Sequence, residues 1–295
     1  MKLRYSEAFY SVQGEGRWVG VPSLFLRVFG CNFECAGFGQ ERGKLIPVDE
    51  MPYNTDERAD PKHELAYTSI EELPVTPVGC DSSASWSKKY KHLQMTKTPE
   101  EVFEHLVSLL PDGTFEGRHG EDIHLVITGG EPLLGWQRVW PSLLSMCKEI
   151  GLKNVTFETN GTQLVKEELI NYFNSPEGED IHVTWSTSPK LSLSGEKTED
   201  ALKPDSLISM NQVINSYLYN KFVVRDIEDF EEVDMFVQAY KDAMIILDAV
   251  YCMPEGATFE QQTLTEKDVA EACMQTGYKF SPRLHINLFG NAWGT

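Results

Sequence analysis

Two cysteines near the N-terminus have the spacing of a cluster-binding loop, but the expected third cysteine is missing. Cys31 and Cys35 are separated by three residues, and a C-x3-C-x2-C loop would place its last cysteine at position 38, which is Phe38. Three such thiolates hold three irons of a 4Fe-4S cluster and leave the fourth iron open to a small chelating molecule. The two cysteines alone are equally compatible with small buried side chains or with half of a zinc site.

A third cysteine follows a long polar interval. Residues 36–79 are rich in Pro, Gly and Glu, show little periodicity, and lead directly to Cys80 in "VGCDSSASW". Removing residues 36–77 gives "GCNFEC-VGCDSSASW", which restores the C-x3-C-x2-C order. We therefore interpret 36–79 as an insertion and Cys80 as the displaced ligand. Because lengthening a loop adds little closure entropy, we expect a competent cluster.

The composition excludes several classes of function. With 45 acidic and 26 basic residues, the formal net charge is −19, which disfavours direct binding of a nucleic acid. The chain has no apolar run of membrane-spanning length and no apolar secretory region near its start, so we expect a cytoplasmic protein with no membrane partner. Cys147, Cys252 and Cys273 fall in helix or strand patterns and are expected in the core of a protein from a reducing compartment.

Strand-like and helix-like segments alternate along the chain. Apolar runs predict strands at 22–29, 123–128, 154–159, 181–186, 220–224, 245–250 and 283–289. Thr98, Pro99 and Glu101 predict a capped helix start, and a second helix is expected to begin at Thr265 and to end at Gly277. The alternation predicts an α/β fold with a mostly parallel, open or barrel-like sheet. In such folds, the chemistry gathers at the C-terminal strand ends.

Further motifs stand in a fixed order along most of the chain. They are "FYSVQGEGRWVGVPSLFLRVFGCN" (9–32), "TGGEPLL" (128–134), "ETNGT" (158–162), "TSPK" (187–190), "MPEG" (253–256) and the C-terminal "RLHINLFGNAWGT". Together with the cysteines, they resemble the radical S-adenosylmethionine enzymes and, within them, the 7-carboxy-7-deazaguanine synthases. The resemblance implies a single domain, residues 1–295, with a partial (β/α) barrel of the radical S-adenosylmethionine type that carries the insertion 36–79 in its cluster loop.

The resemblance also implies which residues bind the cofactors. Cys31, Cys35 and Cys80 would hold a 4Fe-4S cluster, whose open iron takes the amino and carboxylate groups of S-adenosylmethionine. Glu131 would pair with its ammonium group, and Lys190 would supply positive charge to its polar groups. The residues expected to bind S-adenosylmethionine are Gly130, Glu131, Glu158, Asn160, Ser188, Pro189 and Lys190.

The implied substrate is 6-carboxy-5,6,7,8-tetrahydropterin, a flat bicycle with one carboxylate. Arg27 would bind that carboxylate as a planar bidentate partner, and the other substrate-binding residues are expected to be Val12, Gln13, Gly14 and Thr128. Ser82 stands where the family often has a threonine that helps bind Mg²⁺, an ion that prefers oxygen ligands. His285 lies in a predicted strand, where a histidine is usually structural, so it receives no role.

The implied activity is a radical ring contraction that releases ammonia and forms 7-carboxy-7-deazaguanine, as in queuosine-type biosynthesis. The implied partners are an external electron donor such as flavodoxin or ferredoxin and a second copy of the chain in a homodimer. The alternatives are another radical S-adenosylmethionine enzyme, such as a glycyl-radical activase, a non-catalytic protein with structural zinc, and a member whose insertion has disrupted the cluster. The Q-G-E-G opening and "CDSS" disfavour the activase.

Overall fold

A nine-stranded sheet forms the centre of the computed structural model, which describes all 295 residues. The strands follow the order β3-β1-β2-β4-β5-β6-β7-β8-β9; β1 is antiparallel to β2 and β3, and the others run parallel from β2 to β9. Their bounds are β1 Leu3–Val12, β2 Pro22–Val28, β3 Met95–Lys97, β4 His124–Gly129, β5 Asn154–Thr159, β6 His182–Thr187, β7 Ser216–Val224, β8 Ala249–Pro254 and β9 Lys279–Phe280. The edge strands β3 and β9 do not pair, so the sheet is open.

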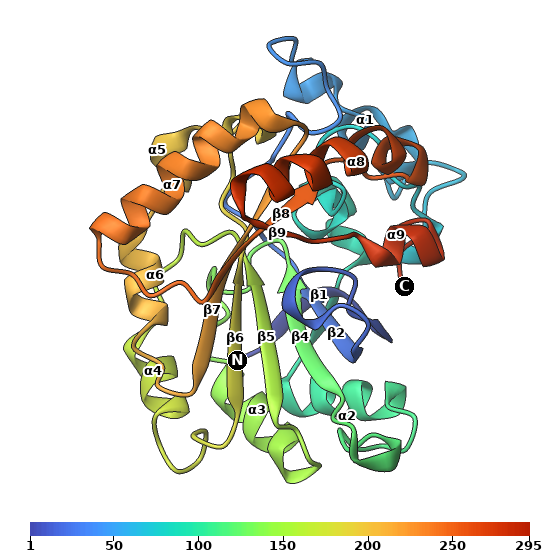
Figure 1. Ribbon diagram of the computed structural model, residues 1–295. Coiled ribbons are helices and arrows are strands. Elements are labelled where there is room, and N and C mark those ends of the chain that lie inside the picture. Colours follow the sequence, from blue (N-terminus) through green and yellow to red (C-terminus); the bar gives the residue numbers. More distant parts are fainter.

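Nine helices lie around this sheet. They are α1 Pro52–Thr55, α2 Pro99–Leu109, α3 Trp140–Glu149, α4 Glu167–Phe173, α5 Thr198–Ala201, α6 Pro204–Met210, α7 Phe230–Asp242, α8 Phe259–Thr276 and α9 Leu284–Phe289. Figure 1 shows α3, α4, α6 and α7 around the outside of the strands, while α8 lies above the strands near α1 and α9 lies at the right, next to the C-terminus. None of these helices combines the length and the apolar character needed to span a membrane.

The parallel strands carry apolar side chains on one face and polar side chains on the other. Ile127, Phe157 and Trp185 belong to a cluster of 48 buried apolar residues beneath the outer helices. The neighbouring positions Thr128 and Glu158 instead line a cavity on the inner face. Because successive side chains of a strand point to opposite faces, the same strands supply both the core and the cavity wall.

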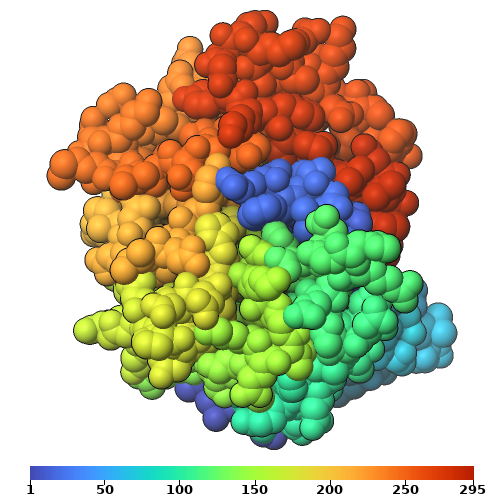
Figure 2. All heavy atoms as spheres, turned by 60° about the horizontal axis from the view of Figure 1, so that its bottom comes forward, coloured from blue at the N-terminus to red at the C-terminus, as the bar shows by residue number.

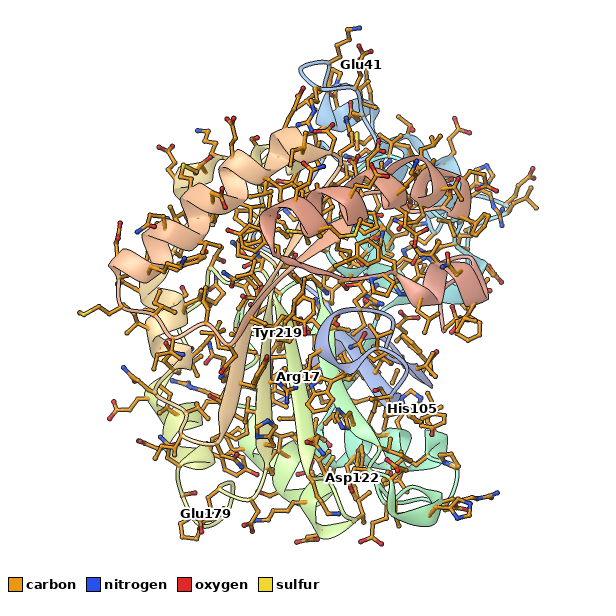
Figure 3. The ribbon with its side chains drawn as sticks, in the orientation of Figure 1. Arg17, Glu41, His105, Asp122, Glu179 and Tyr219 are labelled. Atoms are coloured by element: carbon orange, nitrogen blue, oxygen red, sulfur yellow. The ribbon has the colours of Figure 1, made fainter.

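The segment after β1 covers the inner face near the starts of β6 and β7. Trp18 donates its indole N–H to Thr184 Oγ1 at 3.1 Å, and the Arg17 guanidinium lies 3.8 Å from the ring centroid of Tyr217. Gly16 has a φ of +69°, and a Cβ there would lie 2.3 Å from the Tyr219 hydroxyl. Figure 3 shows Arg17 and Tyr219 close together at the centre of the molecule, and Figure 2 shows the blue N-terminal segment enclosed between the red and green parts of the chain.

The insertion 36–79 contains no strand and is built from short helical turns. It shares a separate hydrophobic cluster with the segment after Cys80. The eight buried residues of this cluster are Met51, Tyr53, Ala59, Tyr67, Ile70 and Leu73 from the insertion, and Ala84 and Tyr90 from the segment that follows. The first residues of the insertion are tied to the sheet side, since Gly37 N–H donates to Ser194 O and Gly39 N–H to Glu255 Oε1, both at 2.8 Å. Figure 3 shows Glu41 at the top of the molecule, away from the strands.

The predicted α/β class and the mostly parallel sheet are confirmed, and most predicted strands match observed ones. The capping box at Thr98 is also confirmed, since its hydroxyl accepts from Glu101 N–H at 3.3 Å and its own N–H donates to the Glu101 carboxylate at 2.8 Å. The run 245–250 overlaps β8 only at its end, because β8 begins at Ala249.

Two local predictions were wrong. The run 283–289 forms the helix α9 rather than a strand, because Leu284 N–H donates to Gly14 O and turns the chain back toward β1, away from the edge strand β9. Helix α8 begins after Thr258, which forms a capping box with Gln261, so Thr265 lies inside the helix. The end at Gly277 is confirmed, where a φ of +80° closes the helix.

Candidate functional site

One cavity lies at the C-terminal ends of the parallel strands, between the insertion and the C-terminal tail. It gathers residues from all three groups of predicted site positions, namely Val12, Gln13, Gly14, Arg27, Cys31, Cys35, Cys80, Ser82, Thr128, Gly130, Glu158, Asn160, Ser188 and Lys190. Only Glu131 and Pro189 of the predicted set do not line it. Parallel strands end at the same edge of a sheet, which brings these distant positions together.

The three cysteines reach the cavity because the two ends of the insertion meet. Gly79 N–H donates to Phe38 O at 2.7 Å, which places Cys80 beside the loop that carries Cys31 and Cys35. Cys35 has a φ of +49°, and its N–H donates to the Glu196 carboxylate at 2.7 Å. All six cysteines of the chain are free thiols. The structure thus presents three thiol groups to one space despite the long interval between them.

Burial changes the acidity of these thiols. It raises the pKa of Cys31 to about 12 and that of Cys80 to about 11, and it raises the pKa of Cys35 well above its usual value. The ammonium group of Lys190 opposes the shift at all three positions. Thiolates at this site therefore need a strong positive partner, as iron in a cluster provides.

The donor set fits a cluster better than a single ion. No three side chains of His, Cys, Asp or Glu converge on one point where they could hold one metal ion. In a 4Fe-4S cluster each thiolate binds a different iron, so the sulfur atoms stand apart from one another. Three free thiols that line one cavity without converging on one point are compatible with this requirement.

The Gly-Gly-Glu turn after β4 packs tightly against the cysteine loop. A Cβ at Gly130 would lie 2.2 Å from Gly30 O and 3.0 Å from Cys31 Cβ, so this position requires glycine. The fully buried Glu131 carboxylate accepts from Thr159 Oγ1 and Asn160 N–H, both at 2.7 Å. Burial raises the pKa of Glu131. Its side chain therefore orients the turn after β5, and its contact with S-adenosylmethionine stays a prediction.

The other positions predicted for S-adenosylmethionine divide into two groups. Asn160 Nδ2 lies 3.9 Å from Cys31 Sγ, and Lys190 Nζ donates to Ser188 Oγ at 3.1 Å, so these residues surround the thiols. Pro189 is buried outside the cavity lining, because it directs the turn after β6 rather than facing the space.

Glu158 is hydrogen-bonded to two of the residues predicted to bind the substrate. Its carboxylate accepts from Gln13 Nε2 and from Thr128 Oγ1, both at 3.1 Å. Its Oε1 also lies 4.0 Å from Lys221 Nζ. Glu158 thus links β1, β4 and β7 across the inner face.

Arg27 points from β2 into the cavity and is held there by two contacts. Its Nε donates to the buried Glu7 carboxylate at 2.7 Å, and its Nη1 donates to Ser82 Oγ at 3.2 Å. Ser82 Oγ in turn donates to Asp81 Oδ1 at 3.2 Å. Burial opposes the charge on Arg27, but Glu7 outweighs it and raises the pKa. Arg27 stays cationic and has its remaining N–H groups free for a carboxylate.

The sequence interpretation missed a largely buried network of ion pairs that lies beside Arg27 and Ser82 in the cavity lining. Arg283 Nε pairs with Glu15 Oε1 at 3.0 Å, and its Nη2 pairs with Asp81 Oδ2 at 2.6 Å. Glu15 also pairs with Lys221. Burial disfavours ionised Glu15, but the cations around it prevail and hold its pKa below the usual range. A lysine inside the apolar run "NKFVV" was a signal for this network.

The C-terminal tail closes the cavity above the Q-G-E-G turn. His285 packs against Gly14 so closely that a Cβ there would lie 2.1 Å from its Nδ1. Burial lowers the pKa of His285 to about 4, so the ring is neutral near pH 7. Trp293 and Thr295 complete the lining on this side.

Comparisons with known proteins agree with the order of the motifs. The chain is 28% identical over 296 residues to 7-carboxy-7-deazaguanine synthase of Halobacterium salinarum, covering 98% of this chain and 91% of that protein. It is 27% identical over 293 residues to the enzyme of the same name from Pyrobaculum aerophilum, covering 99% and 97% of the two chains. No model of a protein family matches the sequence.

A solved structure supports the fold. The crystal structure of QueE from Escherichia coli superposes with a TM-score of 0.52 at 19% identity, covering 96% of this chain and 95% of that chain. It shows the same mixed α/β architecture with a mostly parallel sheet. The chain is thus a relative, over nearly its whole length, of the 7-carboxy-7-deazaguanine synthases.

Proposed function

We propose that this protein is a radical S-adenosylmethionine lyase. It would convert 6-carboxy-5,6,7,8-tetrahydropterin to 7-carboxy-7-deazaguanine with release of ammonia, in the biosynthesis of 7-deazaguanines such as queuosine. One observation carries this proposal. A single cavity is lined by three free thiols, by an arginine that can bind a carboxylate, and by polar groups that can bind the edge of a flat ring. The full-length relatives named for that product support the assignment.

Cys31, Cys35 and Cys80 would hold the 4Fe-4S cluster, and Gly130, Asn160, Ser188 and Lys190 would surround S-adenosylmethionine beside it. When bound, these two groups supply an electron and a 5′-deoxyadenosyl radical that removes a hydrogen atom from C6 of the pterin. Cys35 is buried and Cys31 and Cys80 are half-buried, which limits the access of water to this chemistry. The absent side chain at Gly130 lets backbone groups approach the ligand.

The substrate would lie between the Q-G-E-G turn and the inner face of the sheet. Arg27 would take the carboxylate through the N–H groups that Glu7 and Ser82 leave free. The Val12 backbone and Gln13 would meet the pterin edge, and Glu158 would accept hydrogen bonds from its N–H groups. The ion pairs of Glu15 with Lys221 and Arg283 hold these three side chains charged and in fixed orientations beside the substrate space.

Mg²⁺ would bind at Ser82, with Asp81 beside it. The adjacent hydroxyl and carboxylate are the oxygen donors that this ion prefers, and substrate oxygens and water would complete its shell. Serine supplies the hydroxyl at the position where the family often has threonine.

The finer features of the fold and setting belong to this proposal. We propose that the open sheet is the partial (β/α) barrel of a single radical S-adenosylmethionine domain spanning residues 1–295, with 36–79 inserted in its cluster loop. We further propose a homodimer in the cytoplasm, served by an external electron donor such as flavodoxin or ferredoxin. The free thiols fit a reducing compartment.

The decisive test is anaerobic reconstitution, followed by incubation with S-adenosylmethionine, dithionite, Mg²⁺ and 6-carboxytetrahydropterin. Mass spectrometry should detect 7-carboxy-7-deazaguanine. If 5′-deoxyadenosine forms without it, the cluster assignment stands and the substrate is wrong. Iron and sulfide analysis separates both results from structural zinc, which would leave the protein without iron.

A further inference from the structure

A short lysine-rich segment follows the third cysteine. Residues 87–97, "SKKYKHLQMTK", carry four lysines and a histidine with no acidic residue, in a chain whose net charge is −19. Three of these lysines, Lys88, Lys89 and Lys91, are exposed to solvent. Such a concentration of positive charge needs an explanation on an otherwise acidic protein.

The local structure displays this charge in a fixed orientation. Residues Lys88–Leu93 form a 3₁₀ helix, in which side chains three positions apart share a face. Tyr90 and Leu93 form the inward face and pack with the insertion cluster. The other two faces therefore present Lys88 with Lys91 and Lys89 with His92.

These lysines form one wall of a surface groove, and the other wall is part of the insertion. The lining residues are Thr55, Asp56, Glu57, Ala59, Asp60, Pro61, Lys62, His63, Lys88, Lys89, Lys91 and His92. With neutral histidines, its four lysines exceed its three carboxylates by one charge. Asp56 and Asp60 already accept from backbone N–H groups within the insertion, at 3.0 and 2.9 Å. We call these twelve residues the lysine groove.

The lysine groove adjoins the cysteine wall through two aromatic side chains. Trp86 lies two residues before Lys88 and lines the cavity that holds Cys80. Tyr53 packs edge-on against Trp86 with ring centroids 5.1 Å apart, and a Cβ at Gly79 would lie 3.0 Å from the Tyr53 ring. Figure 1 shows the light-blue and cyan segments that contain the groove at the upper right, beside α8 and α9. The chain segments that carry the groove are thus connected to the cavity lining through this aromatic pair.

We propose that the lysine groove docks an acidic electron-carrier protein that reduces the cluster. The inference rests on the proposed function, because a catalytic cluster must receive an electron for each cleavage of S-adenosylmethionine. The carrier loses one electron, which the cluster receives and delivers to the sulfonium. Charge complementarity selects the partner. Carboxylates on the surface of the carrier would pair with the lysines of the groove, whereas the acidic remainder of this chain would repel them.

The test compares a protein reductant with a small one. In the Lys62→Gln, Lys88→Gln, Lys89→Gln, Lys91→Gln variant, dithionite-driven turnover should equal that of the unsubstituted protein. Turnover driven by a reduced acidic flavodoxin should lose about tenfold in kcat/KM, and its dependence on ionic strength should flatten, because steering acts on association. Stopped-flow bleaching of the cluster by the same flavodoxin should slow equally.

A matched variant controls for the loss of charge. Lys166→Gln, Lys241→Gln, Lys267→Gln removes three exposed lysines from the start of α4, from α7 and from α8, and should change neither reaction. An equal loss of flavodoxin-driven turnover in the control variant and in the groove variant would overturn the proposal. An unchanged rate with flavodoxin in the groove variant would overturn it as well. Selective loss of binding to a transfer RNA, with flavodoxin reduction intact, would assign the groove to nucleic acid and also overturn it.

The outcome is separable from that of the proposed function. If dithionite yields no deazaguanine product, the proposed substrate fails, yet cluster bleaching still reports docking. If the reconstituted protein contains no iron, both proposals fail.

Discussion

The two walls of the cavity are stabilised in different ways. The wall formed by β1, β2 and β4 to β8, called the strand-built wall, is stabilised by the 48-residue core and by ion pairs such as Arg283 with Glu15. The wall formed by residues 36–90, called the inserted wall, is stabilised by a separate cluster of eight buried residues and by hydrogen bonds between its ends, including Gly79 N–H to Phe38 O. The difference indicates that the two sides of the cavity have separate hydrophobic cores, and that the insertion returns Cys80 to the loop of Cys31 and Cys35 through contacts at its ends.

Removing the Cys80 thiol, at the point where the two walls meet, should have the largest effect. Cys80→Ala should abolish product formation and the absorbance of the reconstituted cluster, because three thiolates are needed for stable ligation. Cys147→Ala is the matched control; it removes a buried core thiol and should keep the cluster, with a loss of about 1 kcal/mol in the free energy of unfolding. A fully active Cys80→Ala enzyme would refute the ligand assignment.

Breaking the ion network should destabilise the strand-built wall. Arg283→Met leaves Glu15, whose side chain is 13% exposed, and Asp81, which is 30% exposed, with fewer partners, so the free energy of unfolding should fall by about 3 kcal/mol in urea titrations. Arg118→Gln removes an exposed pair with Asp112 and should change it by about 0.5 kcal/mol or less. Similar effects of the two substitutions would show that the network contributes nothing specific.

Opening the core of the insertion should affect only the inserted wall. Met51→Ala removes a fully buried side chain, and such truncations cost about 2 to 5 kcal/mol. Hydrogen exchange should speed up across 36–79 while β4 to β6 keep their protection. Leu125→Ala, in the main core, should instead lower protection throughout the sheet. Uniform loss in both variants would mean that the walls unfold as one unit.

The smallest expected effect is a pH dependence of stability from His285. Its folded pKa, lowered by burial to about 4, lies below the unfolded value near 6.5. Its contribution is therefore present above pH about 6.5 and is lost as the pH falls toward 4, by about 2 to 3 kcal/mol. His124, whose pKa burial also lowers to about 4, acts in the same window.

Urea titrations between pH 7 and 4 measure this dependence. His285→Gln should remove roughly half of the slope, and a second replacement, His124→Gln, should remove most of the rest. An unchanged slope in the His285 variant would show that its ring takes up a proton equally in the folded and unfolded chain.

Much of the site could be predicted from motifs because they lie where parallel strands end. The strands around Thr128 and Glu158 carry apolar residues at alternate positions, so their polar members stood out. Lys221 and Arg283 escaped notice because their partner Glu15 is more than 200 residues away along the chain. Residues 283–289 form a short apolar run, and such a run fits a short helix as well as a strand, so the sequence did not identify α9 as a helix.

The sequence by itself determined the α/β class, the three cysteines and the motifs that follow the strands, because each depends on local periodicity or on residue type. Only the tertiary structure decided that Phe38 and Gly79 close the insertion, that Glu131 accepts from Asn160 N–H, and that Glu158 accepts from Gln13. These outcomes depend on which distant backbone and side-chain groups come within hydrogen-bonding reach, and residue spacing along the chain does not encode that distance.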